Sequence, residues 1–289
     1  MVTVVIPLYN REDTIGRALL SVINQTYQDI EIIIVDDCSD DKSVEIVESF
    51  NDSRLHIIKL NSNEGASSAR NIGIKAAKGE LIAFQDSDDE WYPEKLSIQI
   101  QALLDTNSDI VASKYQQINQ NGKKRIIPIE DIADMNIPNR ILMGNFIGTP
   151  TLLCKKSCFT ENLFDSRLPR LQDWDLLIAL SRKYNIHFIN EVLVDAYLQN
   201  NSISIDNNKL EKALAMIFAK YDEYFANNVF AHKKILRSLG YVKMQNRNFA
   251  VNYYKKAMRV GGADIRTLIR LLQFWLKKAF FYVIGIANR

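Results

Sequence analysis

The chain has 289 residues, of which 47% are hydrophobic and 24% charged, and its formal net charge is +2 at pH 7. These proportions are typical of a folded globular protein and argue against an intrinsically disordered chain. The chain has three cysteines, Cys38, Cys154 and Cys158, and the pair Cys154 and Cys158 has no other Cys or His neighbour at metal-ligand spacing. This pattern argues against a disulfide scaffold or a zinc site and suits a reducing cytoplasm.

Charge is unevenly distributed along the chain. Residues 1–204 hold 20 Lys and Arg against 29 Asp and Glu, whereas residues 205–289 hold 16 against 5. The basic C-terminal part is therefore expected to meet an anionic surface, either lipid headgroups or a polyanion. The alternative is a helical face whose charges are simply solvated.

The first 110 residues alternate short apolar runs with helical patterns. The first residues, Met-Val-Thr-Val-Val-Ile-Pro, have no cationic leader and predict a strand instead of a signal peptide. The apolar runs are Val2–Pro7, Glu31–Val35, Leu55–Leu60 and Glu80–Gln85, and the helical patterns between them are Thr14–Gln25, Lys42–Phe50 and Ala66–Lys78. This alternation predicts an α/β fold with a mainly parallel sheet flanked by helices.

The pattern is less regular in residues 111–170. Helical spacing returns at Leu171–Tyr184, a short strand is expected at Phe188–Tyr197, and from Leu210 onward the pattern is helical. The sequence thus predicts a catalytic domain over residues 1–204 and a basic helical appendage over residues 205–289.

Four polar segments directly follow predicted strands, where ligands bind in open parallel sheets. They are Val5-Ile6-Pro7-Leu8-Tyr9-Asn10, Ile34-Val35-Asp36-Asp37-Cys38-Ser39, the stretch from Asn63 to Asn71 that includes Gly65 and Arg70, and Phe84-Gln85-Asp86-Ser87-Asp88-Asp89. Asp and Ser after a strand are also common turn formers and helix caps, so each segment alone has a purely structural explanation.

The acidic segment after the last of these strands is the most informative. Three carboxylates within four residues repel one another unless a cation is present. Hard divalent ions such as Mg²⁺ or Mn²⁺ take oxygen ligands, often one or two protein carboxylates plus substrate phosphates. Asp86 and Asp88 therefore predict a metal–diphosphate site. Trp91, just behind it, is expected either to form a wall of the substrate pocket or to belong to the core.

Together with Asn24-Gln25-Thr26-Tyr27, these segments closely resemble the motifs of family 2 glycosyltransferases of the GT-A fold. A later segment, Leu171-Gln172-Asp173-Trp174-Asp175-Leu176, resembles the acidic catalytic motif of that family. The resemblance runs in order from Val4 to about Leu180. It implies a GT-A type catalytic domain, which is an expectation for the structure to test.

The resemblance also implies residue roles on the nucleotide side of the site. Pro7 and Tyr9 would contact the nucleotide, and Asp37, with Asp36, would hold the base through a carboxylate that matches the N3–H of uracil. Arg70 would lie near the base.

On the metal side, the resemblance implies that Asp86 and Ser87 meet the ribose and the metal, and that Asp88 is the main protein ligand of Mn²⁺ or Mg²⁺. Asp173 would be the general base. Its alternative role is that of an acid stabilised at a helix N-terminus. The family motif usually has Glu before this acid, whereas Gln172 stands here, which puts a role for that first position in doubt.

The predicted function is that of an inverting, metal-dependent hexosyl- or N-acetylhexosaminyl-type transferase. It would move a sugar from a nucleotide diphosphate sugar, expected to be UDP-linked, to a hydroxyl of a glycan or lipid-linked acceptor in bacterial surface polysaccharide synthesis. The alternatives are a nucleotidyltransferase, or a nucleotide-sugar-binding protein without turnover. A nucleic-acid partner is not expected, because the basic tail lacks interleaved aromatics on a recognisable binding fold.

The last predicted helix, Ile265–Ala287, has no apolar stretch long enough to span a bilayer. Arg266, Arg270 and Lys277 share one helical face, and Trp275 and Phe281 occupy the remaining surface. This composition is typical of a helix that lies in a membrane interface. We therefore expect a cytoplasmic protein, peripheral on the inner face of the plasma membrane; the alternative is a helix packed on the catalytic domain.

Overall fold

The computed structural model of the chain describes residues 1–133, 137–198, 206–245, 251–262, 264–265, 267–269 and 272–273. Contacts divide the chain into two compact units. The first comprises Met1–Ile141, Asn145–Arg167 and Gln172–Ser202, and the second comprises Leu142–Gly144, Leu168–Leu171 and Ile203–Arg289. The division into domains at residues 204 and 205 stays a prediction.

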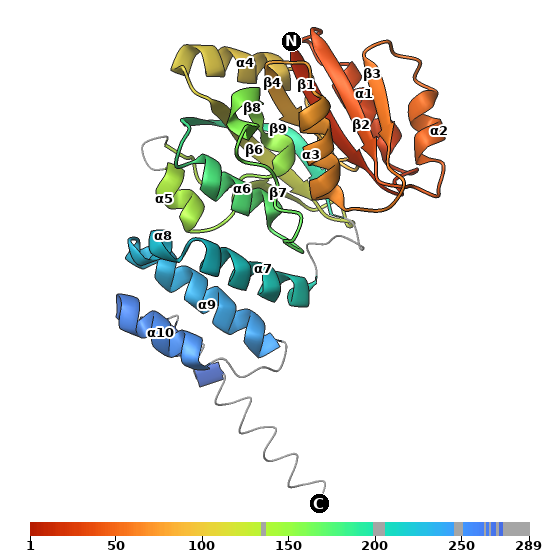
Figure 1. The fold of residues 1–289 in the computed structure, drawn as a ribbon. Coiled ribbons are helices and arrows are strands. Elements are labelled where there is room, and N and C mark those ends of the chain that lie inside the picture. Colours follow the sequence, from red (N-terminus) through yellow and green to blue (C-terminus); the bar gives the residue numbers. More distant parts are fainter. Residues whose placement is uncertain are drawn as a thin grey trace, which may run out of the picture. The chain divides into compact units, whose positions relative to one another are not determined.

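The first unit is built on one mixed sheet with the strand order β3-β2-β1-β4-β8-β6-β9-β5, and β7 pairs with β6 (Figure 1). Its strands are β1 (Val2–Leu8), β2 (Ile30–Asp36), β3 (Leu55–Lys59), β4 (Leu81–Phe84), β5 (Glu90–Trp91), β6 (Ile110–Ile118), β7 (Lys124–Ile127), β8 (Leu153–Lys155) and β9 (Ile186–Tyr197). The helices are α1 (Ile15–Ile23), α2 (Ser43–Glu48), α3 (Ala66–Ala76), α4 (Lys95–Thr106), α5 (Ile137–Leu142) and α6 (Gln172–Leu180), with short 3₁₀ turns η2 (Thr149–Thr151) and η3 (Lys156–Phe159).

Side-chain alternation along β1 decides how the helices cover the sheet. Val4, Ile6 and Leu8 belong to a buried core that also contains Ile15 and Leu19 of α1. The neighbouring residue Val5 faces the other side, where α3 crosses in front of β1 in Figure 1. A Cβ atom on Gly73 of α3 would come within 2.4 Å of Val5 Cγ1, so the close approach of this helix requires glycine. Burial on both faces explains why β1 and β2 read as continuous apolar runs.

The predicted α/β fold is confirmed, and the four strands β3-β2-β1-β4 are parallel as expected. The rest of the sheet is mixed: β8 runs antiparallel to β4 and β6, whereas β9 is parallel to β6. The strands β7 and β8, and all of β6 except its first residue, fall in residues 111–170, where the sequence pattern is less regular and no element was assigned.

Trp91 belongs to the core, which settles the choice between core and pocket wall. Its side chain is 2% exposed, and its indole N–H donates to the Pro150 carbonyl at 3.0 Å. The Lys95 Nζ lies 3.9 Å above the Trp91 ring and donates to Gln99 Oε1 at 2.6 Å. Burial lowers the pKa of Lys95 to about 7. This buried polar group anchors β5 behind the acidic segment.

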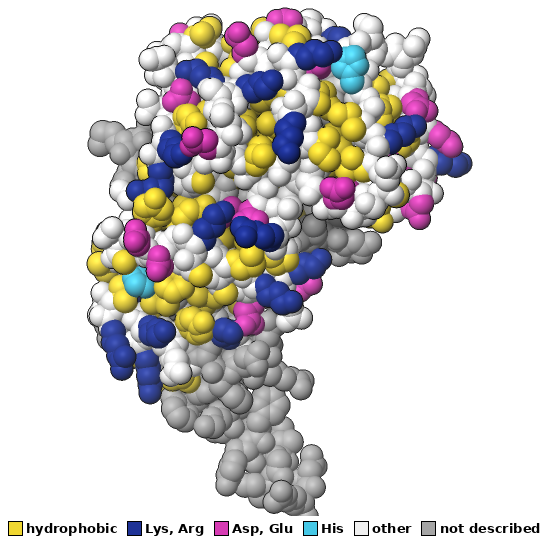
Figure 2. Space-filling view, viewed as in Figure 1, with side chains coloured by type: hydrophobic (Ala, Val, Ile, Leu, Met, Phe, Trp, Pro, Cys, Tyr) yellow, Lys and Arg dark blue, Asp and Glu magenta, His cyan; other side chains and the backbone are white. Residues whose placement is uncertain are grey.

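The second unit is helical, with α7 (Asn207–Lys220), α8 (Asp222–Ala226), α9 (Val229–Gln245) and α10 (Val251–Gly261). Asp206 caps α7 by accepting from the backbone N–H groups of Asn208 and Lys209. A Cβ on Gly240 of α9 would lie 2.9 Å from the Tyr254 ring, so the α9–α10 pair packs closely at this point. Figure 2 shows apolar side chains exposed on this unit among lysine and arginine side chains.

Within the described residues, no helix is long and apolar enough to cross a membrane. The predicted interfacial helix Ile265–Ala287 lies mostly outside them: Arg266, Arg270, Trp275, Lys277 and Phe281 are not described.

Candidate active site

The predicted site residues after β1, β2 and β4 lie along one edge of the sheet. The parallel register pairs Leu8 with Asp36, so β1 and β2 end level with each other, and β4 ends in the same direction at Phe84, opposite Val5. Pro7 is a buried residue of β1, and Tyr9, just beyond the strand, is 44% exposed. The fourth polar segment follows β3, which is parallel to β2, and its Gly65 N–H donates to Asp37. The structure thus brings all four polar segments to the edge at which open parallel sheets bind ligands.

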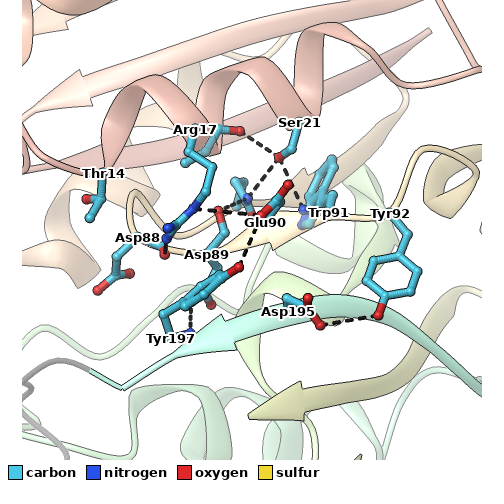
Figure 3. A network of polar contacts seen from close by, with 12 residues as sticks. Thr14, Arg17, Ser21, Asp88, Asp89, Glu90, Trp91, Tyr92, Asp195 and Tyr197 are labelled. Atoms are coloured by element: carbon cyan, nitrogen blue, oxygen red, sulfur yellow. Dashed lines mark hydrogen bonds and ion pairs between the residues drawn. The ribbon is translucent and has the colours of Figure 1, made fainter. Parts of the chain in front are cut away.

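The segment Asp86–Asp89, called here the acidic turn, is fixed through its backbone. The Asp89 N–H donates to the Asp86 carbonyl at 3.1 Å. The Ser87 carbonyl accepts from Thr14 Oγ1 at 2.9 Å, and the Asp88 carbonyl accepts from Arg17 Nη2 at 2.6 Å. Thr14 and Arg17 come from the start of α1 (Figure 3). The turn is therefore held by side chains far from it in sequence.

The acidic side chains of the turn divide into two classes. Asp89 is 6% exposed, and its Oδ1 accepts the Tyr197 backbone N–H at 3.0 Å. Asp86 and Asp88 are more open, with 27% and 22% of their side chains exposed. Asp86 Oδ1 pairs with Arg70 Nη2 at 2.6 Å, and Asp88 Oδ2 lies 3.7 Å from Arg11 Nε. Asp86 and Asp88 are thus the two carboxylates that a ligand can reach.

Mutual repulsion and burial shape the protonation of these groups. Desolvation, followed by the negative charge of Asp86, raises the pKa of Asp88. The pKa of Asp89 is raised well above its usual range by burial and by both neighbouring carboxylates. A divalent cation beside Asp86 and Asp88 would relieve this repulsion.

The donor set of the acidic turn fits a hard divalent ion that shares its coordination with substrate. Among the described residues, no group of three or more His, Cys, Asp or Glu is arranged to hold a metal by itself. Mg²⁺ and Mn²⁺ are commonly bound by one or two carboxylates together with phosphate oxygens. Two partly exposed carboxylates in one turn match that mode, so Asp86 and Asp88 would hold the ion jointly with a diphosphate.

On the nucleotide side, Asp36 and Asp37 organise the loops that surround them. The Asp36 carboxylate accepts the Ser39 backbone N–H at 3.3 Å, and Asp37 accepts the N–H groups of Glu64 and Gly65 at 2.7 and 2.8 Å. Gly65 has φ of +87°, a conformation that favours glycine, and begins α3. Asp37 therefore ties the end of β2 to the start of α3. Both aspartates are buried, at 4% and 3% exposure, and their contact with a base stays a prediction.

Arg70 is held at the acidic turn by its ion pair with Asp86. Its side chain is 11% exposed, and its guanidinium carbon lies 5.4 Å from the centre of the Phe164 ring. Arg70 comes from the second turn of α3, which connects the nucleotide-side loops to the acidic turn. A role beside the base stays a prediction.

Asp173 occupies the first turn of α6, with both carboxylate oxygens engaged. Oδ2 accepts from Asn145 Nδ2 and Oδ1 accepts from the Trp174 backbone N–H, each at 2.8 Å. Desolvation raises the pKa of Asp173 in spite of these two hydrogen bonds. A carboxylate with a raised pKa is better matched to taking up a proton near neutral pH.

The acidic turn and Asp173 belong to one electrostatic neighbourhood. The charges of Arg70 and Asp86 both act on the pKa of Asp173. Tyr115 of β6 is influenced from both sides, because burial and then the charges of Asp173 and Asp89 raise its pKa. Charges separated by almost 90 positions in the sequence therefore act on one another in the folded chain.

Sequence reasoning missed several residues that build this site: Arg11, Thr14, Arg17, Tyr115, Asn145 and Tyr197. The spacing of Thr14 and Arg17, three residues apart at a helix start, could have indicated that they share a face. Asn145 and Tyr115 lie in the region without a clear period, and nothing in their sequence context singled them out.

Comparisons with known proteins agree with this architecture. The model of the family "Glycosyl transferase family 2" matches residues 3–160. An *Escherichia coli* relative, the "UDP-Glc:alpha-D-GlcNAc-diphosphoundecaprenol beta-1,3-glucosyltransferase WfgD", is 32% identical over 73% of this chain and 82% of its own length. An uncharacterized glycosyltransferase of *Rickettsia felis* is 29% identical over 96% of this chain. This chain spans only 51% of that relative.

Solved structures share the fold at low sequence identity. *Staphylococcus aureus* TarS 1–349 in complex with UDP-GlcNAc superposes with a TM-score of 0.68 at 22% identity, over 90% of this chain and 81% of TarS 1–349. The mannosyltransferase PcManGT of *Pyrobaculum calidifontis*, in complex with GDP-Man and Mn²⁺, gives a TM-score of 0.62 at 15% identity, over 96% and 80% of the two chains. The GT-A type fold predicted from the sequence is confirmed.

Proposed function

We propose, from the premise that this chain belongs to glycosyl transferase family 2, that it transfers a hexose or N-acetylhexosamine with inversion from a UDP-sugar to a hydroxyl of a lipid-linked glycan. Family membership favours sugar transfer over the nucleotidyltransferase alternative. The reaction would build a bacterial surface polysaccharide; support comes from the Bacillus subtilis relative TuaG, named a putative teichuronic acid biosynthesis glycosyltransferase.

One observation carries this proposal. The open carboxylates of Asp86 and Asp88 lie in the same electrostatic neighbourhood as Asp173, a carboxylate whose pKa is raised. A sugar transferase needs both functions: a cationic centre for the departing diphosphate and a base for the attacking hydroxyl. A protein that only binds nucleotide-sugars needs no base for an attacking hydroxyl.

The proposed chemistry is a single displacement. Asp173 takes the proton of the acceptor hydroxyl. At the same time the oxygen of that hydroxyl attacks the anomeric carbon from the face opposite the diphosphate. The bond from the anomeric carbon to the diphosphate oxygen breaks, and UDP leaves with the bonding electron pair. Mn²⁺ or Mg²⁺, held by Asp86 and Asp88, would neutralise the charge of the leaving group. Asn145 keeps the Asp173 carboxylate oriented through its 2.8 Å hydrogen bond.

The donor side of the proposal extends the roles predicted from the sequence. Tyr9, which is exposed, and Pro7 would contact the nucleotide, and Asp36 and Asp37 would hold the uracil through oxygen lone pairs that their backbone hydrogen bonds leave free. Ser87 would meet the ribose. Support for uridine comes from the UDP-linked donors named for WfgD and TarS.

Binding of a UDP-sugar is therefore expected to depend on metal. Titration calorimetry of UDP-glucose, UDP-GlcNAc and GDP-mannose in Mn²⁺, and again in EDTA, measures this directly. We expect at least about 10-fold tighter binding of a UDP-sugar in Mn²⁺, since a bridging cation adds charge-assisted contacts to the diphosphate. Equal affinities in Mn²⁺ and EDTA would contradict metal-dependent binding of the donor. Tighter binding of GDP-mannose than of either UDP-sugar would contradict the choice of uridine as the base.

We further propose that the helical unit holds the enzyme on the cytoplasmic face of the plasma membrane, close to a lipid-linked acceptor. The described residues of the tail support this placement. Ile265, Leu268, Ile269 and Leu272 are 74%, 51%, 47% and 59% exposed. Exposed apolar side chains in a region with excess positive charge suit a membrane interface.

Liposome flotation of the full chain and of a version ending at residue 264 tests the membrane proposal. The full chain is expected to float with vesicles containing anionic lipid and only weakly with neutral ones, because each cation near the surface contributes ~1 kcal/mol. The truncated version should stay largely in solution. Absence of flotation for both, with a lower melting temperature on truncation, would make the tail a packing element instead.

A further inference from the structure

Arg17 holds the backbone of the acidic turn and not its carboxylates. Its Nη2 donates to the Asp88 carbonyl at 2.6 Å, the shortest contact between α1 and the turn. In Figure 3 the Asp88 side chain extends away from the Arg17 guanidinium, which meets the main chain. Arg17 thus fixes the position of Asp88 while leaving its carboxylate to other partners.

Tyr197, the last residue of β9, packs its aromatic ring against the Arg17 guanidinium. The Arg17 guanidinium carbon lies 3.8 Å from the centre of the Tyr197 ring, at cation–π distance. Tyr197 also reaches the neighbouring strand, because its hydroxyl donates to Glu90 Oε2 at 3.2 Å. Arg17 Nε lies 3.8 Å from the same carboxylate oxygen. Arg17, Tyr197 and Glu90 therefore form a three-membered cluster, called here the Arg17 clamp.

The clamp grips the acidic turn at two successive residues. Arg17 donates a hydrogen bond to the Asp88 carbonyl, and the Tyr197 backbone N–H donates to Asp89 Oδ1 at 3.0 Å. These contacts join α1, β5, β9 and the turn, which are separated by up to 180 residues in the chain. Two carboxylates that repel each other cannot fix their own spacing, so an external support must set it.

We propose that Arg17, stacked on Tyr197, is a positioning residue for sugar transfer: the clamp fixes the acidic turn so that the Asp88 carboxylate meets the cation bound to the donor diphosphate. The proposal rests on the proposed function of the acidic turn. It assigns to Arg17 and Tyr197 a role that neither the motif pattern nor the comparisons assign. Both residues act through the acidic turn: Arg17 through the Asp88 carbonyl, and Tyr197 through the Arg17 guanidinium and Asp89 Oδ1.

Four variants of the full chain separate positioning from plain stability. Arg17→Met keeps the aliphatic stem and removes the guanidinium, whereas Tyr197→Leu removes the ring beneath it. Tyr197→Phe keeps the ring and the backbone N–H and loses only the hydroxyl bond to Glu90. Arg54→Met is the matched control, since Arg54 makes ion-paired contacts to Asp52 in the same unit but away from the acidic turn.

The first measurement is the affinity for Mn²⁺ at a fixed UDP concentration. Binding is monitored as the loss of the electron paramagnetic resonance signal of free Mn²⁺. Arg17→Met and Tyr197→Leu should each weaken Mn²⁺ binding about 10-fold, the size expected for losing one charge-assisted hydrogen bond or its support. With the enzyme turning over, kcat should fall about 10-fold with little change in the KM of the acceptor. Tyr197→Phe keeps the ring beneath Arg17 and should therefore lose less Mn²⁺ affinity and less kcat than Tyr197→Leu. Arg54→Met should stay within about 3-fold of wild type, whatever its melting temperature.

The second measurement needs neither metal nor donor, so it survives a failure of the proposed function. Amide hydrogen exchange over residues 86–91 should become about 10-fold faster in Arg17→Met and unchanged in Arg54→Met. If wild type binds no UDP but exchange still accelerates, the clamp stands and the sugar-transfer role falls. Unchanged exchange in the turn, or Mn²⁺ affinity that simply follows melting temperature across all four variants, would overturn the clamp.

Discussion

Asp173→Asn should lower kcat by ~10²–10⁴-fold, the usual contribution of a positioned general base, while the donor dissociation constant changes less than about 3-fold. The amide is nearly isosteric with the carboxylate but cannot accept the proton. The Trp174 N–H can still donate to the remaining carbonyl oxygen, and Asn145 can turn its amide to accept from the new NH₂ group, so both local contacts can be kept. Single-turnover rates and calorimetry with the UDP-sugar measure the two quantities separately.

The pH profile gives a second signature of the same residue. The base must be unprotonated to act, so kcat/KM falls as pH falls through the pKa of Asp173. Desolvation raises that pKa, and the acid limb should therefore lie above the ordinary range of an aspartate. Asp109→Asn is the matched control. This variant also replaces a carboxylate by an amide and loses an ion pair, the one with Lys155, but away from the acidic turn. Asp173→Asn retaining more than about a third of the wild-type rate would place the base elsewhere.

Asp88→Asn should reduce transfer by ~10³-fold at Mn²⁺ concentrations that saturate the wild type, because the ion contributes several kcal/mol to stabilising the leaving diphosphate. The cause is weakened metal binding, so raising Mn²⁺ should restore part of the rate. The same titration on Asp109→Asn should match wild type. If Asp88→Asn shows wild-type metal dependence, Asp88 is not a ligand of the cation, and the assignment of the acidic turn fails with it.

The sequence was most informative where function and topology demand the same residues. Parallel strands buried on both faces must be apolar, so β1, β2 and β4 were recognisable, and the polar residues after them stood out. Asp86 and Asp88 could be singled out because clustered carboxylates at a strand end need a reason, whereas Asp173 was singled out by the resemblance of its segment to the acidic motif of the family. The structure brings these three into one electrostatic neighbourhood.

In the second half of the sheet, β9 matches the strand expected at Phe188–Tyr197, but β5, β6, β7 and β8 could not be predicted in this way. The strand β8 has three residues and β5 has two, too few to show any period. Their place is fixed by contacts distant in sequence, such as the Trp91 hydrogen bond to Pro150. For the same reason the supports of the site were missed: Asn145 lies in a loop without periodicity, and Arg17 reads from sequence as an ordinary surface residue of an amphipathic helix.

The central claim is that this chain moves a sugar from a UDP-sugar to a lipid-linked acceptor with Asp173 as base. The most direct measurement is the mass of a GlcNAc-diphosphate-lipid acceptor after incubation with the chain, Mn²⁺ and each of UDP-glucose, UDP-GlcNAc and GDP-mannose. We expect the acceptor to gain one sugar from a UDP-linked donor, with an equal amount of UDP released, and both products to be lost in Asp173→Asn. Equal product from wild type and Asp173→Asn, or UDP-sugars bound while the acceptor mass stays unchanged with every donor, would contradict it.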